Sequence, residues 1–282
     1  MNASPPPDST PATDRVSRTG VTGSTGGAAA LGGAVLGLVA SGRALVSVFM
    51  RTLYFLLRGT TQRGAVATQM YEIGNRSLVF LCVVMGFIGM IFVYQTGLQT
   101  KRVVPDLSLL GATYLELLVR DLAATICALM LATRVGAGIA AEIGSMVVTE
   151  QVDALRMCAA DPIDYLLKPR FVASVVMTTM LVVLAAAVAT GTGMYTGYAF
   201  FDINPRTFLS GQLLDVGDVT VGLCKCVAYG AAIPVISGYC GLTAFGGSEG
   251  VGQATTRAVV NSSLAVIMLD FLISGAGFLV FG

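Results

Sequence analysis

Charged side chains at Arg120, Asp121 and Lys225 interrupt segments of the chain that are otherwise strongly apolar. A charge inside a membrane-spanning segment is costly, and it normally faces a cavity or a charge of opposite sign. Arg134 marks one end of the apolar segment that contains Arg120, and Arg120 lies 14 residues before it, about 21 Å along a helix. Asp218 marks the end of another apolar segment at the opposite membrane surface, and Lys225 lies seven residues after it, about 10 Å deep. Both sites then reach a similar depth, which favours a polar patch that receives an anionic lipid headgroup.

Two other arrangements fit the same residues. A structural ion pair, either Asp121 with Lys225 or Glu116 with Arg120, would fix how the helices pack. A neutral lipid cavity lined by the Met and Phe side chains of Met85–Phe92 is also consistent with the composition. The sequence leaves these alternatives open.

Asp270 is the only charged residue of the last apolar segment. We expect a structural role for it, because polar partners precede it at Thr255, Thr256, Asn261, Ser262 and Ser263. An intramembrane enzyme that uses Asp121 or Asp270 is disfavoured, since no accompanying nucleophile or HExxH-like metal motif is present.

Several other classes of chemistry are excluded by composition. The chain has no histidine, which excludes His-based metal sites and Ser-His or Cys-His catalysis. Its six cysteines lack zinc spacing and are expected to be small membrane hydrophobes. No phosphate-binding loop of the GxxxxGK[ST] type occurs, so any ATP and Mg²⁺ must be bound by another chain. A net charge of +1 without a basic tract gives no indication of nucleic-acid binding.

The segment Arg134–Arg170 is a polar island between two long apolar segments. The pattern predicts a helix from about Ala140 to Ala159 that ends at Asp161-Pro162. Between two spans, such a helix can transmit force from a soluble motor, although a solvated amphipathic connector has the same pattern. The candidate docking residues are Glu142, Glu150, Gln151, Asp153 and Arg156.

The composition determines the fold class in which these residues are positioned. Hydrophobic residues make up 55% of the chain and charged residues only 12%, against about 25% charged in soluble domains. We therefore predict an all-α integral membrane protein. Five segments are long enough to cross a bilayer core of about 30 Å: Ser77–Tyr94, Leu109–Ala132, Phe171–Phe201, Val219–Phe245 and Val259–Phe281.

The chain before the first span divides into two parts. Residues 1–26 are rich in Pro, Ser, Thr and Gly and are expected to be a disordered extension. Residues 27–76 are expected to form interfacial helices, because Arg43, Arg51 and Arg58 fall near one helix face. A true span or a signal peptide are the alternatives for the apolar part of this region. Residues 77–282 then form the membrane domain.

The distribution of basic residues predicts the orientation. With a cytoplasmic N-terminus, twelve Lys and Arg residues lie inside and three outside, in agreement with the positive-inside rule. The polar island is then cytoplasmic. Gly193 and Gly197 form a GxxxG pair, which fits either packing within one subunit or a dimer contact.

At these residues the chain resembles the MlaE (YrbE) family of ABC-transporter permeases. The resemblance runs from about Tyr54 to the C-terminus, and it is carried by long, specific segments. These are GFIGMIF at Gly86–Phe92, LLVRDLAA at Leu117–Ala124, AEIGSMVVTEQVDAL at Ala141–Leu155, DPIDYLLKPRF at Asp161–Phe171 and ATTRAVVNSSLAVIMLDF at Ala254–Phe271.

The resemblance implies a homodimeric permease of the bacterial inner membrane that moves phospholipids between the inner and outer membranes. It implies a cytoplasmic ATPase dimer docked on the coupling helix, an MCE-domain protein on the outer face and a STAS-type regulator. Steroid or other hydrophobic cargo, and a non-transporting scaffold for an MCE ring, are the alternatives. Family members carry a Lys at the position of Lys225 and a basic-acidic pair at Arg120-Asp121, commonly with Glu in place of Asp121.

Overall fold

The computed structural model describes residues 42–56, 63–103, 110–209 and 215–281 of the 282-residue chain. Regular structure in these ranges is helical throughout, and five helical segments are long and apolar enough to cross a membrane. The predicted all-α membrane fold is therefore confirmed. The five segments are Gly64–Arg102, Leu110–Val148, Ile163–Phe201, Val216–Leu242 and Gly247–Val280. The expected disordered extension and residues 27–41 lie outside the described ranges.

The first span belongs to α2 (Arg63–Val103), a continuous helix of 41 residues. The predicted boundary between the interfacial helices and the membrane domain, at residues 76 and 77, falls inside this helix. The helix therefore begins before the apolar stretch from which the span was predicted. Leu81 and Met85 are buried against the other helices, whereas Val79 and Phe87 are exposed. An exposed face this apolar suits lipid rather than water.

The main partner of α2 is α7 (Lys168–Phe201), and small residues let the two helices approach closely. A Cβ added at Gly89 would lie 2.5 Å from the carbonyl oxygen of Ala189 in α7. The GxxxG pair serves the same purpose within the subunit. Gly193 faces Tyr114, and Gly197 faces Phe208 of the same chain.

We expect Gly89→Ala to lower the free energy of unfolding by about 1–2 kcal/mol, because overpacking against the Ala189 carbonyl outweighs the gain in helix propensity. Gly191→Ala in α7 is the matched control, since a Cβ there meets nothing within 4 Å. Thermal unfolding in detergent micelles would measure both variants. Equal stability of Gly89→Ala and wild type would contradict the close approach of the two helices.

The second span is a single long helix with two π-helical turns. In chain order it consists of α3 (Leu110–Leu117), η1 (Leu118–Leu122), α4 (Ala123–Leu131), η2 (Ala132–Gly136) and α5 (Ala137–Val148). Its 39 residues extend about 58 Å, well beyond a bilayer core of about 30 Å, so one end projects from the membrane. The charged pair Arg120-Asp121 lies in η1, and Arg134 lies in η2. Such π-helical turns occur frequently at functional sites.

The prediction of one helix from Ala140 to Ala159 is wrong. The chain continues the second span through α5 and then turns at Glu150, which adopts a left-handed conformation with φ 60°. A short separate helix, α6 (Gln151–Met157), follows. The β-branched residues 147–149 directly before the turn have low helix propensity, which favours a break there.

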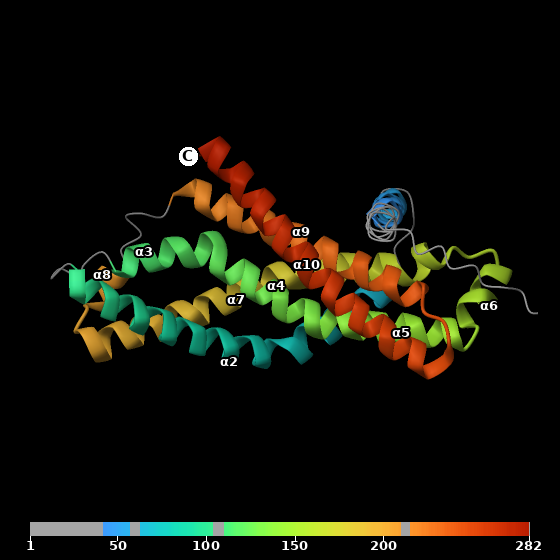
Figure 1. Ribbon diagram of the computed structural model, residues 1–282, viewed down its shortest axis with the longest axis horizontal. Coiled ribbons are helices and arrows are strands. Elements are labelled where there is room, and N and C mark those ends of the chain that lie inside the picture. The colour runs from blue at the N-terminus through green and yellow to red at the C-terminus, as the bar shows by residue number, and fades with distance from the viewer. Residues whose placement is uncertain (1–41, 57–62, 104–109, 210–214, 282) are drawn as a thin grey trace, which may run out of the picture. The chain divides into compact units, whose positions relative to one another are not determined.

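The remaining described helices complete the bundle. The turn η3 (Ile163–Leu167) leads into α7, and the short helix α8 (Pro205–Phe208) lies near α3, at the other end of the bundle from α6 (Figure 1). The helix α9 (Val216–Leu242) begins with a capping box and is the most buried span: 61% of its apolar window, an apolar stretch of 18 residues, is buried. In the last helix, α10 (Gly247–Phe281), only 6% of the corresponding window is buried.

A helix over residues 42–56 precedes α2. Its Thr52 is buried, and Phe49 packs edge-on against Phe171 of α7, with 6.3 Å between ring centroids. Arg51 is exposed. Arg43, another arginine of the predicted basic face, is exposed as well, and the interfacial location stays a prediction. Arg58, the third predicted arginine of this face, lies outside the described residues.

Candidate functional site

Lys225 lies at the centre of a charged network inside the spans. Its side chain on α9 is 0% exposed. The ammonium group pairs with Asp121 of η1 and lies 2.7 Å from Asp270 Oδ1 of α10, and it donates to Ser274 Oγ at 2.7 Å. The second span and α10 thus together supply one acceptor for each of the three ammonium hydrogens. The similar depth predicted for Asp121 and Lys225 is confirmed by this contact.

Asp270 joins the network from the last span. Its Oδ1 accepts hydrogen bonds from Tyr229 at 2.8 Å and from Thr125 at 2.9 Å. The expected partners at residues 255–263 are wrong, because those residues lie two to four helical turns away along α10. Two carboxylates face one ammonium group, so the three groups carry a net charge of −1 when all are ionised.

Arg120 forms a second ion pair with α9. Its Nη1 lies 3.3 Å from Asp218 Oδ1. The alternative pair of Arg120 with Glu116 is therefore wrong: the guanidinium reaches across to α9 instead of along its own helix. Asp218 also accepts a hydrogen bond from the Asp215 backbone amide at 3.2 Å, which holds its carboxylate at the start of α9.

The acidic side of the network is partly open. Asp121 is 34% exposed and Asp270 is 28% exposed, although Lys225 between them is fully buried. Charged oxygens exposed at mid-span depth need a polar environment, because contact with hydrocarbon is costly. The arrangement can therefore fix the packing of three helices and also present charge to a polar group in a cavity.

The alternative cavity lined by Met85–Phe92 does not form as one surface. Met85 is fully buried in the core of the bundle. Phe87 points outward and is 59% exposed. Residues two apart on a helix face different directions, which separates the two side chains.

Asp218, Tyr229 and Ser274 also belong to these groups, although none of them was predicted as a site residue. Their spacing carries a usable signal. Asp218, Lys225 and Tyr229 recur at intervals of seven and four, which places them on one face of α9. Asp270 and Ser274 are likewise four residues apart on α10.

The predicted docking residues are divided between two elements. Glu142 lies on α5, and its Oε2 pairs with Arg170 Nη2 of α7 at 2.7 Å. The other residues lie around the turn into α6. Glu150, Gln151 and Asp153 are exposed, and Asp153 pairs with Arg156 at 3.0 Å on the surface. A short helix with exposed charges at one end of the spans forms a surface that can dock a protein from water.

Metal-binding and disulfide chemistry have no candidate in the described part of the chain. No group of three or more Cys, Asp and Glu side chains lies close enough to hold a metal ion within the described ranges. All six cysteines fall in these ranges and are unpaired thiols.

Comparison with known proteins identifies the family. The family model for Permease MlaE matches residues 66–276, about three quarters of the chain. A probable ABC transporter permease protein of Synechocystis sp. is 37% identical over 235 residues, covering 82% of this chain and 89% of the relative. A probable ABC transporter permease protein of Rickettsia bellii is 36% identical over 233 residues, covering 82% and 86%.

A plant protein is also similar. Protein TRIGALACTOSYLDIACYLGLYCEROL 1, chloroplastic, of Arabidopsis thaliana is 33% identical over 221 residues, covering 78% of this chain and 63% of the relative. The matches extend over all five spans, the charged network and the α5–α6 turn. The chain is therefore a multi-pass membrane protein that belongs to the MlaE family of ABC-transporter permeases.

Proposed function

We propose that this chain is the membrane subunit of a transporter that moves phospholipids between the inner and outer membranes of a bacterium. The observation that carries this function is the pair of partly exposed charges, Arg120 and Asp121, which lie beside the buried Lys225 inside apolar spans. A phospholipid has the matching chemistry, because its charged headgroup needs polar partners while its acyl chains need apolar walls. The Arabidopsis relative is named for a diacylglycerol glycolipid, which supports a polar lipid as cargo.

We infer that a second copy of the chain encloses the charged network and so forms a cavity for the lipid. The apolar window of α10 is only 6% buried, against 61% for α9. Asp270 on α10 is itself partly exposed. A second copy packed on α10 would cover apolar surface and would also enclose the open side of the network, away from lipid.

ATP hydrolysis is assigned to a separate chain. A cytoplasmic ATPase dimer would bind ATP and Mg²⁺ and dock on the surface formed by Glu142, by Glu150 in the turn and by the α6 residues Gln151, Asp153 and Arg156. The N-terminus and α6 would then face the cytoplasm, with an MCE-domain protein at the end that carries α8. A STAS-type regulator would act on the ATPase rather than on this chain.

Arg120→Gln is expected to reduce the phospholipid that co-purifies with the complex by about tenfold, since a charge-assisted hydrogen bond contributes about 1.5–3 kcal/mol. Arg206→Gln in α8 is the matched control outside the network. Native mass spectrometry with lipid analysis of the permease–ATPase complex would measure bound lipid. ATP-dependent lipid transfer between vesicles would measure transport.

The outcomes separate the alternatives. Bound phospholipid that depends on Arg120 supports phospholipid transport. A sterol-like ligand in its place supports the steroid cargo. Partners assembled without bound lipid or transfer support the scaffold, and an unchanged phospholipid content in Arg120→Gln contradicts the assignment of the network to cargo.

A further inference from the structure

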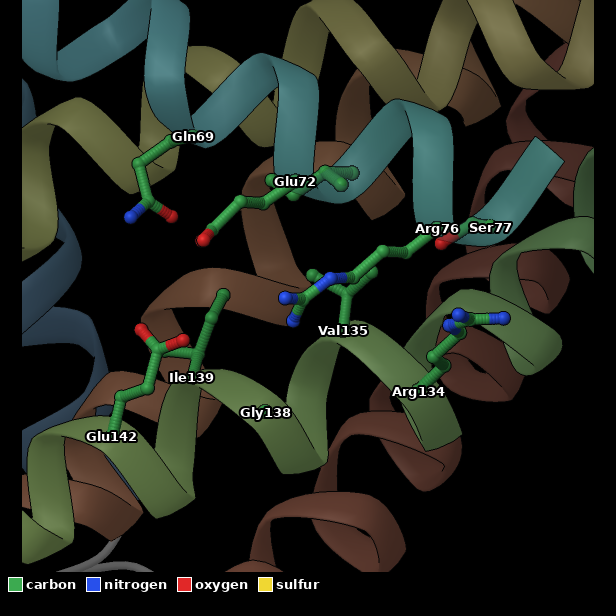
Figure 2. Close-up of a pocket in the computed structure, with 10 residues that line it drawn as sticks. Gln69, Glu72, Arg76, Ser77, Arg134, Val135, Gly138, Ile139 and Glu142 are labelled. Carbon is green, nitrogen blue, oxygen red and sulfur yellow. The ribbon is translucent and has the colours of Figure 1, made fainter.

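A cavity with several charged lining residues lies at the end of the spans that carries α6, apart from the Lys225 network. Its volume is about 220 Å³, and it lies between α2 and the η2–α5 part of the second span (Figure 2). Arg134 is 13 residues from Asp121 along this helix, about 20 Å away. The polar lining residues are Gln69, Glu72, Arg76, Ser77, Arg134 and Glu142.

The cavity contains an unsatisfied buried donor. Ser77 is 1% exposed, and its Oγ has no hydrogen-bond partner among the described residues. A buried hydroxyl group without a partner costs about 1–3 kcal/mol, so its partner is expected to be a bound group. Figure 2 shows Glu72 and Arg76 extending from α2 toward α5, with Glu142 on the opposite side.

The lining carries two arginines and two glutamates, and one of the glutamates is neutralised by an arginine from outside the cavity. Glu142 is already paired with Arg170 at 2.7 Å. Arg76 and Arg134 form no ion pair with a described acidic residue. Two guanidinium groups therefore face one unpaired carboxylate, Glu72. This combination suits a phosphate anion, which guanidinium binds with charge-assisted hydrogen bonds, and it leaves one acceptor for an amine.

The position along the helices indicates the headgroup level of a membrane. The charge-free stretch Ser77–Tyr94 begins directly after Arg76. The apolar part of the second span ends at Ala132, two residues before Arg134. Both arginines thus lie where apolar segments meet polar ones. Basic pockets between spans at this level are suited to lipid headgroups.

We propose that this cavity binds a phosphate group, supplied by the headgroup of a phospholipid in the leaflet on the α6 side. Arg76, Arg134 and Ser77 donate to the phosphate oxygens. Glu72 accepts from an amine of the headgroup. This site is separate from the cargo site assigned to Arg120, and it needs neither the ATPase nor transport.

The test measures binding to the purified, delipidated full-length chain in detergent. The probes are dioctanoyl phosphatidylethanolamine, inorganic phosphate and dioctanoylglycerol, followed by calorimetry. Arg76→Gln is expected to weaken binding of the phosphatidylethanolamine probe at this site by about tenfold or more. Arg76→Lys should retain most of the affinity, because it keeps the charge. Arg102→Gln, in the last turn of the same helix, is the matched control.

Combination with Arg120→Gln keeps the two sites apart. The loss caused by Arg76→Gln should be the same with and without Arg120→Gln, since distant sites contribute independently. If Arg120→Gln alone left binding unchanged, that result would contradict the cargo site but not the phosphate site. No effect of Arg76→Gln in either background, or equal binding of dioctanoylglycerol, would overturn the phosphate site.

Competition identifies the source of the phosphate. Displacement of the lipid probe from the Arg76-dependent site only by a large excess of inorganic phosphate supports the phospholipid headgroup. Displacement at equal concentration would keep the phosphate chemistry but overturn the lipid as its source, because the acyl chains would then contribute nothing.

Discussion

Lys225→Met is expected to lower the free energy of unfolding by about 3 kcal/mol. The ammonium group is fully buried between Asp121 and Asp270, so its removal leaves two carboxylates facing each other inside the spans. Loss of one partner from a buried ion pair costs about 3–5 kcal/mol, and partial exposure of both carboxylates places this site near the lower limit. Chemical or thermal unfolding in detergent micelles, followed by circular dichroism, would measure the loss.

Neutralising the two carboxylates should restore the stability that Lys225→Met loses. The triple variant Lys225→Met with Asp121→Asn and Asp270→Asn should recover most of the stability, because no unpaired charge remains. The double variant without Asp270→Asn should recover less, since Asp270 also faces the ammonium group. Full recovery in the double variant would show that Asp270 contributes little, and a stable single variant would contradict the buried network.

The triple variant also separates packing from lipid binding. If the network serves only to hold η1, α9 and α10 together, the rescued protein should carry as much phospholipid as wild type. A folded triple variant with much less bound phospholipid would assign the charges to the cargo. This comparison is sharper than a single substitution, because stability is held nearly constant.

Glu150→Lys is expected to weaken docking of the partner ATPase at least tenfold while the permease stays folded. Glu150 is exposed at the turn between α5 and α6, so its side chain contributes little to the core. Reversal of a charge at a complementary interface places like charges together, which costs several kcal/mol. Affinity and ATP turnover of the permease–ATPase complex, measured without an MCE protein, would report the effect.

Two further variants control for the backbone at this turn. Glu150 has φ 60°, a conformation that glycine adopts without strain, so Glu150→Gly keeps the turn and removes the carboxylate. Its docking should be intermediate between wild type and Glu150→Lys. Asp202→Lys makes a similar charge reversal at φ 53° after α7, at the other end of that helix. If Asp202→Lys impaired turnover as much as Glu150→Lys, the effect would not come from the α6 surface.

The sequence predicted the spans better than their ends. Long apolar runs revealed all five, because crossing a bilayer requires about 20 apolar residues whatever the packing. The extension of α2 back to Arg63 was missed, because charged and other polar residues alternate with apolar ones over residues 63–76 and interrupt the apolar run. The break at Glu150 was also missed, because a single left-handed residue has no periodicity of its own to detect.

The sequence by itself determined the number of spans and the depth of each charge, because rise per residue along a helix is nearly constant. It therefore indicated that Asp121 and Lys225 could meet. Only the tertiary structure decided which groups do meet: that Arg120 pairs with Asp218 and that Asp270 completes the Lys225 network. The reason is rotation about the helix axis. A face is set by packing between helices, and one extra residue in a π turn such as η1 rotates all that follows by about 100°.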